Sequence, residues 1–202
     1  MSYRVNEIFY SIQGEGANAG RAAVFVRFSG CNLKCPFCDT DFKDFVIMTS
    51  QEIIKEMERV NTGDCSLCVL TGGEPTLQYD EELQKALHKA GYTICMESNG
   101  TKIPNAQIDF LTISPKTQWE NQAKLFVGYP VNEIKVVIDK QTDLSALKYY
   151  EERFPEALYY VQPCDTGHIS ENEDIINRCV RFIEEHPRWR LSLQQQKIIN
   201  VR

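Results

Sequence analysis

Seven short runs of apolar, often β-branched residues recur along the chain and set the expected architecture. They are 22–28 (AAVFVRF), 68–71, 93–98, 110–114, 134–138, 158–163 and 189–194. The runs are continuous rather than alternating, which is typical of strands buried on both faces of a parallel sheet. The pattern therefore predicts six or seven parallel strands.

Three stretches between these runs have a helical pattern. Residues 49–60 begin with a capping box, a threonine followed three residues later by a glutamate. Residues 79–91 have Asp80 in the N-cap position and end on a glycine, and the third stretch is 171–186. The interval 115–133 leaves room only for a short irregular connection.

Strands that alternate with helices predict an α/β fold with a parallel sheet. A complete eight-stranded barrel takes about 250 residues, whereas this chain has 202. We therefore expect an incomplete, open TIM-like barrel with about six parallel strands and few, abbreviated helices. The sequence shows no internal repeat and no Gly-, Pro- or Ser-rich linker, so residues 1–202 are expected to form a single domain.

Small and polar residues gather directly after the predicted strands. They occupy 29–31 (Ser-Gly-Cys), 71–75 (Thr-Gly-Gly-Glu-Pro), 97–100 (Glu-Ser-Asn-Gly), 114–116 (Ser-Pro-Lys) and 162–163 (Gln-Pro). The carboxyl ends of parallel strands meet on one rim of a barrel, where barrel enzymes build their sites. We therefore expect these segments to form one functional site.

Composition narrows the classes of function. The net charge of −6 argues against the broad basic surface of a nucleic-acid-binding protein. No stretch approaches the roughly 20 apolar residues of a membrane helix, and the first residues lack the apolar core of a signal peptide. We therefore expect a cytoplasmic protein that binds neither nucleic acid nor membranes. In that compartment the eight cysteines are expected to be metal ligands or reduced core residues.

Three of the cysteines, Cys31, Cys35 and Cys38, lie within eight residues on a polar loop. A structural zinc ion usually takes four ligands, and Cys65 with Cys68 could supply a second pair. A ferredoxin-like electron carrier would also need a fourth thiolate. A disulfide is disfavoured in the cytoplasm, and a loop containing Lys, Pro and Asn is poor material for packed, unligated cysteines. We favour an iron–sulfur cluster in which one iron has no protein ligand and can bind a small molecule.

The spacing Cys-x₃-Cys-x-aromatic-Cys resembles the cluster loop of the radical S-adenosylmethionine (SAM) enzymes, whose incomplete barrel also matches the expected fold. The resemblance implies that Cys31, Cys35 and Cys38 hold a [4Fe–4S] cluster whose fourth iron binds SAM. It implies further SAM contacts at the aromatic position of this loop, in TGGEP and at later strand ends. These are Phe37, Gly73, Ser98, Ser114, Pro115, Lys116 and Gln162.

Other segments narrow the resemblance to the family of 7-carboxy-7-deazaguanine synthases. They include NEIFYSIQGEG (6–16), FVRFSGCNLKCPFCDT (25–40), LTGGEPTLQ (70–78), NEIKVV (132–137) and WRLSLQ (189–194). This resemblance implies a lyase-type reaction in 7-deazapurine (queuosine) biosynthesis. The substrate would be 6-carboxy-5,6,7,8-tetrahydropterin, the product 7-carboxy-7-deazaguanine, and ammonia would be lost. SAM would supply a radical and be regenerated.

The same resemblance implies substrate contacts at Ile12, Gln13, Gly14, Glu15, Arg27, Thr71 and Arg202, and a Mg²⁺ ligand at Thr40. Arg27 offers a planar guanidinium for the carboxylate of the substrate, and the carboxylate of Glu15 could accept from the pterin N–H groups. The C-terminal tail is expected to reach the active site. An electron donor such as flavodoxin or ferredoxin, and a homodimer, are also implied.

The tail departs from the family pattern at one place. Where the family usually has Thr-His-Lys, this chain has Gln195-Gln196-Lys197. A role that needs a titrating histidine cannot be transferred to Gln196, because glutamine forms hydrogen bonds but does not titrate.

Two other functions remain open at this level. One is a radical SAM activase that generates a glycyl radical on a partner protein. The other is a non-catalytic zinc or electron-transfer module, for which three rather than four ligands in the cysteine loop is unfavourable. The short chain, without a further cysteine-rich insertion, favours the ring-contracting enzyme over the activase.

Overall fold

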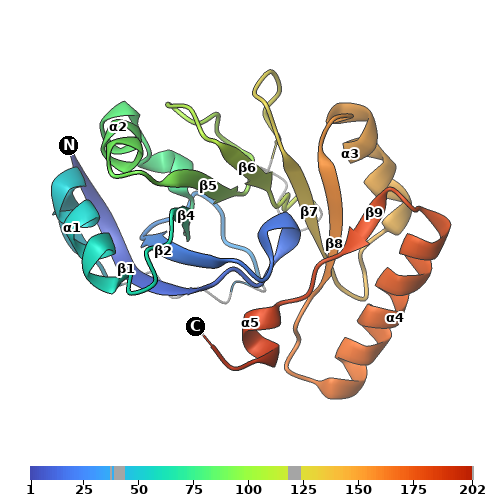
Figure 1. Ribbon diagram of the computed structural model, residues 1–202. Coiled ribbons are helices and arrows are strands. Elements are labelled where there is room, and N and C mark those ends of the chain that lie inside the picture. Colours follow the sequence, from blue (N-terminus) through green and yellow to red (C-terminus); the bar gives the residue numbers. More distant parts are fainter. Residues whose placement is uncertain (37, 39–43, 118–123, 202) are drawn as a thin grey trace.

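The computed structural model describes the chain apart from residues 37, 39–43, 118–123 and 202. The strands are β1 (Ser2–Ile12), β2 (Ala22–Phe28), β3 (Val46–Thr49), β4 (Leu67–Gly72), β5 (Thr93–Ser98), β6 (Phe110–Ile113), β7 (Glu133–Ile138), β8 (Leu158–Pro163) and β9 (Trp189–Leu191). They form one sheet in the order β3-β1-β2-β4-β5-β6-β7-β8-β9. The sheet is strongly curved but does not close on itself (Figure 1).

All seven predicted strands are present as β2 and β4 to β9, and each is parallel to its neighbours in this set. The predicted α/β fold with an open, mostly parallel sheet is therefore confirmed. Two strands were not predicted: β1 runs antiparallel to β2, and β3 runs antiparallel to β1. They extend the sheet beyond β2.

The helices are α1 (Ser50–Val60), α2 (Glu81–Lys89), α3 (Lys148–Arg153), α4 (Ile169–Glu185) and α5 (Gln195–Ile198), with 3₁₀ segments η1 (Gly16–Asn18), η2 (Pro75–Leu77) and η3 (Leu144–Leu147). The predicted capping box of α1 is present, because Thr49 and Glu52 each accept the other's backbone N–H. At α2, Asp80 accepts the Leu83 N–H as predicted. Among the helices that the structure describes, none combines the length and apolar character needed to cross a lipid bilayer.

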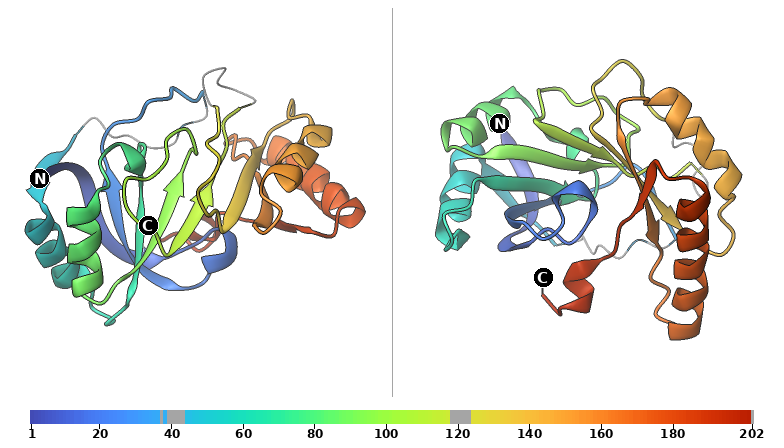
Figure 2. Two further views of the ribbon diagram at one scale, coloured as in Figure 1. Left: turned by 90° about the horizontal axis from the view of Figure 1, so that it is seen from above. Right: turned by 45° about the vertical axis from the view of Figure 1, so that its right-hand side comes forward.

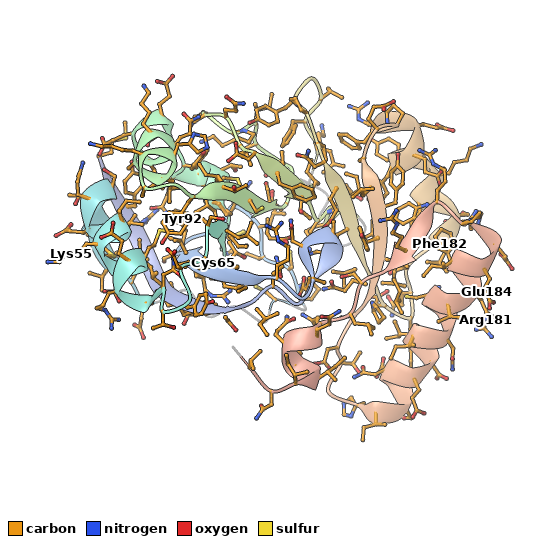
Figure 3. All side chains as sticks on the ribbon, viewed as in Figure 1. Lys55, Cys65, Tyr92, Arg181, Phe182 and Glu184 are labelled. Carbon is orange, nitrogen blue, oxygen red and sulfur yellow. The ribbon has the colours of Figure 1, made fainter. Side chains whose placement is uncertain are left out.

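Two apolar clusters lie on opposite faces of the sheet. The larger one joins the outer face to the helices and includes Met57 of α1, Leu87 of α2 and Phe182 of α4. Figure 2 shows these helices along the outside of the curved sheet. In Figure 3, Lys55 of α1 and Glu184 of α4 project from the same helices into solvent.

The smaller cluster lies on the inner face of the sheet and consists of Phe9, Ala23, Phe25, Leu67, Val69 and Cys95. The rings of Phe9 and Phe25 stack with their centroids 4.9 Å apart. Residues two positions apart on a strand share a face. The next inward residues on β2, β4 and β5 are therefore Arg27, Thr71 and Glu97, and a polar layer lies above an apolar floor.

The segment after β9 lies against the segment after β1, across the open side of the sheet. The Gln195 N–H donates to the Gly14 carbonyl at 3.1 Å, and the Gly16 N–H donates to the Ser192 hydroxyl at 3.0 Å. These bonds hold the C-terminal segment beside the polar layer of the inner face.

Candidate active site

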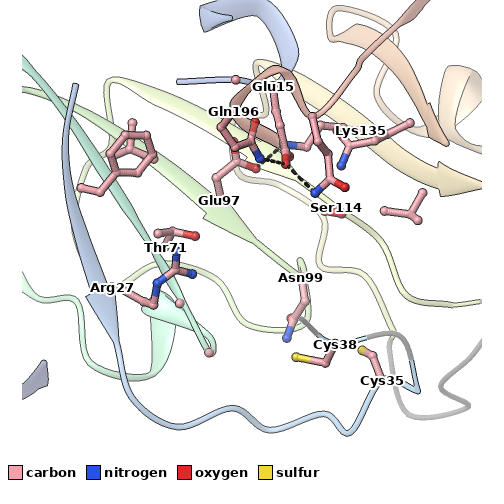
Figure 4. Close-up of a pocket in the computed structure, with 18 of the residues that line it drawn as sticks. Glu15, Arg27, Cys35, Cys38, Thr71, Glu97, Asn99, Ser114, Lys135 and Gln196 are labelled. Atoms are coloured by element: carbon pink, nitrogen blue, oxygen red, sulfur yellow. Dashed lines mark hydrogen bonds and ion pairs between the residues drawn. The ribbon is translucent and has the colours of Figure 1, made fainter. Parts of the chain in front are cut away.

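A cavity of about 650 Å³ opens on the inner face of the sheet, toward the carboxyl ends of the parallel strands. Phe9, Phe25 and Val69 of the inner cluster line its apolar part. Most of the residues singled out in the sequence line it as well: Ile12, Gln13, Gly14, Glu15, Arg27, Cys31, Cys35, Cys38, Thr71, Gly73, Ser98, Ser114, Lys116 and Gln162. The strand ends that were expected to meet on one rim therefore do meet (Figure 4).

One described residue among those singled out is not part of this lining, and three others cannot be placed. Pro115 is buried next to Ser114 but does not line the cavity. Phe37, Thr40 and Arg202 lie outside the described residues, so their roles stay predictions.

The three loop cysteines line one end of the cavity. The backbone N–H of Cys38 donates to the Cys35 carbonyl at 3.2 Å, and the Asn99 amide lies 3.9 Å from the Cys31 sulfur. Burial raises the pKa of the Cys31 thiol, so its thiolate needs a positive partner such as a metal centre. Cysteine thiolates are the usual ligands of iron–sulfur clusters, so these three thiols are suitable ligands for one.

The arrangement of possible ligands does not by itself distinguish zinc from another metal centre. Among the described residues, the loop cysteines included, no group of three or more His, Cys, Asp or Glu side chains is arranged to hold a metal ion. Cys65 donates its thiol to the Ala22 carbonyl at 2.8 Å, and Cys68 is fully buried in β4. This second cysteine pair is therefore part of the packing.

The loop after β4 passes very close to the start of the cysteine loop. The Gly73 N–H donates to the Phe28 carbonyl at 3.0 Å, and the Glu74 N–H donates to the Gly30 carbonyl at 2.9 Å. A Cβ atom on Gly73 would lie 2.0 Å from the Gly30 oxygen. Glycine is required at position 73 because this approach leaves no room for a side chain.

Glu74 ties the loop after β4 to the loop after β5. Its carboxylate is fully buried and accepts from the Ser98 hydroxyl (2.8 Å), the Asn99 N–H (2.7 Å), and both the N–H (3.1 Å) and hydroxyl (2.6 Å) of Thr76. Burial raises the pKa of Glu74, although these hydrogen bonds oppose the rise. Asn99 continues the chain of contacts to Asn32 at 3.0 Å. Three loops around the cysteines are thereby fixed relative to each other.

Arg27 lies in the polar layer of the inner face. Its Nε donates to Glu7 Oε1 at 2.8 Å, and its guanidinium lies over the Phe9 ring at 5.8 Å from the centroid. Glu7 and Arg27 face each other across the β1–β2 pair. Glu7 therefore holds a planar cation at the edge of the cavity.

Lys135 joins two carboxylates from different parts of the chain. Its Nζ lies 2.7 Å from Glu15 Oε2 and 2.9 Å from Glu97 Oε2, and its side chain is only 3% exposed. Burial alone would lower the pKa of Lys135, but the two carboxylates outweigh this and raise it. Burial would likewise raise the pKa of Glu15, but Lys135 and two glutamine amides lower it to about 2. These groups form an ionised wall of the cavity (Figure 4).

The C-terminal segment completes this wall. The side-chain amides of Gln194 and Gln196 both donate to Glu15 Oε1 at 3.1 Å. Lys197 pairs with Asp165 at 3.0 Å. Gln196, at the position where the sequence departs from the family pattern, therefore donates a hydrogen bond to a carboxylate, a role that needs no titration.

Three residues singled out as SAM contacts form side-chain hydrogen bonds at strand ends. The Lys116 ammonium donates to the Ser114 hydroxyl at 2.7 Å, and burial lowers the pKa of this lysine. The side-chain amide oxygen of Gln162 accepts a hydrogen bond from the Ser192 hydroxyl at 2.8 Å.

Sequence reasoning missed the roles of Glu74, Glu97, Glu133 and Lys135. Lys135 carries a signal that could have been used, because it is a lone cation within the apolar run 134–138. Glu133 lies two residues earlier on the same strand and therefore on the same face. Which carboxylates Lys135 contacts depends on the tertiary fold.

Comparison with known proteins supports an enzyme of one family. Residues 25–140 match the family model described as the radical SAM superfamily. A protein of Bacteroides thetaiotaomicron named 7-carboxy-7-deazaguanine synthase is 42% identical over 202 residues, covering all of both chains. A protein of the same name from Bradyrhizobium diazoefficiens is 37% identical, again over the whole of both chains.

A solved structure agrees with this result. The crystal structure of QueE from Escherichia coli superposes with a TM-score of 0.78 at 25% sequence identity, covering 96% of this chain and 94% of that one. The similarity therefore extends through the parts of the fold that build the cavity.

Proposed function

This chain belongs to the radical SAM superfamily and, within it, to the 7-carboxy-7-deazaguanine synthase family, and we propose that it converts 6-carboxy-5,6,7,8-tetrahydropterin to 7-carboxy-7-deazaguanine with loss of ammonia. The observation that carries the proposal is full-length identity to relatives of that name, 42% in the B. thetaiotaomicron protein. The cavity is compatible with it, because thiols line one end and charged groups line the wall.

Family membership implies a [4Fe–4S] cluster and SAM as cofactors. Cys31, Cys35 and Cys38 would hold the cluster, and Gly73 with Ser114 would lie against SAM. When bound, the cofactors would supply an organic radical for removal of a hydrogen atom from the substrate, and SAM would be regenerated.

The described residues contribute binding and orientation. Arg27, held in place by Glu7, presents its guanidinium to the carboxylate of the pterin. Thr71 is paired with Arg27 across β2 and β4 and adds a hydroxyl on the same face. The apolar floor of Phe9, Phe25 and Val69 excludes water beneath the rings of the ligand.

Magnesium is part of the proposal, with Thr40 and substrate oxygens as ligands. Mg²⁺ prefers hard oxygen ligands, keeps several waters and often completes its shell with substrate. Turnover should therefore fall when Mg²⁺ is removed with a chelator and return when it is added back.

The proposal extends to the compartment, the electron donor and the oligomeric state. No disulfide joins any of the eight cysteines, all of which lie in the described residues, and the cytoplasm is proposed as the compartment because it keeps thiols reduced. A flavodoxin or ferredoxin would supply the electron there, and the enzyme would act as a homodimer. The activase alternative is not favoured, because the curated relatives reported above carry the synthase name.

Anaerobic turnover tests the proposal directly. The reconstituted enzyme is incubated with SAM, reductant, Mg²⁺ and the carboxypterin, and deazapurine, ammonia and remaining SAM are measured. We expect many turnovers per SAM, and a matched Cys35→Ser variant should give none. Release of 5′-deoxyadenosine without any deazapurine would reject the proposed reaction.

A further inference from the structure

The two carboxylates that contact Lys135 differ in how many hydrogen-bond donors they already accept. Glu15 accepts three donors: Lys135 on Oε2 and the amides of Gln194 and Gln196 on Oε1. Glu97 accepts Lys135 on Oε2 at 2.9 Å, and on Oε1 only the Gln13 amide at a long 3.3 Å. A carboxylate offers about four acceptor positions. Within the described part of the chain, Glu97 therefore has more acceptor capacity left for a ligand.

Glu97 is also well placed for a ligand. It lies on the inner face at the end of β5, and both it and Arg27 line the cavity. In the view of Figure 4, Glu97 lies between the Glu15–Gln196 contacts and the side chains of Thr71 and Arg27. Its side chain is 20% exposed, close to the 18% of Glu15, whereas that of Lys135 is 3% exposed. The cation is covered while both carboxylates face the cavity, so the acceptor positions left open distinguish Glu97 from Glu15.

The chemistry of the cavity wall selects a class of ligand. A guanidinium at Arg27 suits a carboxylate, and a carboxylate at Glu97 suits two adjacent N–H donors. The ring N–H and the exocyclic amino group of a 2-amino-4-oxopyrimidine ring are such a pair. A 6-carboxypterin has both features at opposite ends of one planar molecule.

We infer that Glu97 is the carboxylate that recognises the 2-amino-4-oxopyrimidine edge of the substrate, and that Glu15 positions the C-terminal segment. The inference rests on the proposed function for the class of substrate. Lys135 keeps both carboxylates in place, since it contacts Glu15 and Glu97 at once. The assignment replaces the sequence-based expectation that Glu15 accepts the pterin N–H groups.

The test combines two ligands with two matched variants. The ligands are 6-carboxypterin and 6-carboxylumazine, in which a carbonyl replaces the 2-amino group. Binding to the holoenzyme with SAM is followed by quenching of pteridine fluorescence. Wild-type protein should prefer the pterin by roughly 10- to 100-fold, as expected for a hydrogen bond to a charged group.

The variants separate the two carboxylates. Glu97→Gln should reduce the preference to within about threefold, because a neutral amide replaces the charged acceptor. Glu15→Gln should weaken both ligands but keep the preference. Iron content and substrate-free reductive cleavage of SAM show whether each variant keeps its cofactors. Glu97→Asp retains the charge and should keep part of the preference for the pterin. This variant also tests the assignment if Glu97→Gln fails to fold.

The outcomes are distinct. Unchanged preference in Glu97→Gln, or loss of the preference in Glu15→Gln alone, overturns the assignment to Glu97 and leaves the proposed function intact. If wild-type protein neither binds nor converts the carboxypterin, the proposed function fails, and this inference fails with it.

Discussion

At the residue scale, Glu133 is a buried carboxyl group whose protonation is set by its surroundings. It is the first residue of β7, is 1% exposed and accepts the Ala17 N–H at 2.7 Å. Burial, and then the charge of Glu97, raise its pKa from 4.5 to about 7. Because Ala17 belongs to η1, Glu133 fixes the turn that follows the candidate substrate segment at Gln13–Glu15.

The raised pKa predicts how stability depends on pH. Between about pH 4.5 and 7 the folded protein holds a proton that the unfolded chain has lost, so the free energy of unfolding falls as pH rises through this window. Glu133→Gln removes this contribution. The test is thermal unfolding of both proteins at pH 5 and at pH 8. Between these two pH values the unfolding free energy of wild type should fall by roughly 1–3 kcal/mol more than that of the variant, or by several degrees in Tm.

An exposed glutamate provides the control for this measurement. Glu173→Gln on α4 removes the same charge from the surface and should leave the pH dependence unchanged. Equal behaviour of the two variants would show that burial of Glu133 does not control the pH response.

Gly73 is a second residue with a sharp expected effect. An alanine Cβ would lie 2.0 Å from the Gly30 carbonyl oxygen, so Gly73→Ala must push the cysteine loop away from the loop after β4. Displacements of about 1 Å can reduce catalysis by about 100-fold. The rate of reductive SAM cleavage and the iron content should both fall.

Gly91→Ala separates this effect from general strain. Gly91 has a φ of +82° and open space around its Cβ position, so alanine there costs about 1–2 kcal/mol of stability without touching the site. SAM cleavage should stay at the wild-type rate. A Gly73→Ala protein with normal iron and normal cleavage would contradict the close approach of the two loops.

At the element scale, the parallel strands were predictable because both of their faces are buried or enclosed. β1 (SYRVNEIFYSI) was missed since its inner face alternates polar and apolar side chains, with Glu7 beside Arg27 and Phe9 on the floor. β3 has only four residues, and Val46 and Ile47 are exposed. β1 lacks the continuous apolar run that marked the other strands, and in β3 the run is only three residues long.

The same reasoning explains which site residues could be found. Arg27 was singled out through the family resemblance, and a single charge within an apolar strand also needs a partner. Lys135 has the same signature, but its partners come from the loop after β1 and the end of β5. Glu74 was noticed only as part of TGGEP, because its buried hydrogen bonds to Ser98 and Asn99 join two loops that are distant in sequence. Pairings between distant elements are a property of the fold and are not written in local sequence.

At the scale of the whole molecule, an open sheet leaves one side of its interior unprotected. The C-terminal segment covers part of this side through Gln194, Gln196 and Lys197, which contact Glu15 and Asp165. None of the described residues after Leu193, which are 194–201, belongs to either apolar cluster. The segment therefore contributes to the site far more than to the core.

This division predicts the effect of truncation. A chain that ends at Leu193 keeps β9 and the Ser192 contacts to Gly16 and Gln162, so its Tm should fall by only a few degrees. Its affinity for carboxypterin should fall about tenfold or more, because Glu15 loses two of its three donors. Substrate-free SAM cleavage should persist, since Cys35 and Cys38 lie apart from Glu15 and Gln196 in the cavity (Figure 4).

A shorter truncation tells whether the segment or the terminal residue is responsible. Removal of 200–202 deletes Arg202, a predicted substrate contact, but keeps the glutamine contacts to Glu15. If the affinity loss follows from anchoring Glu15, this variant should bind carboxypterin more tightly than the longer truncation. Equal losses would assign the effect to Arg202, and the tail would then act through a direct charge on the substrate and not by closing the sheet.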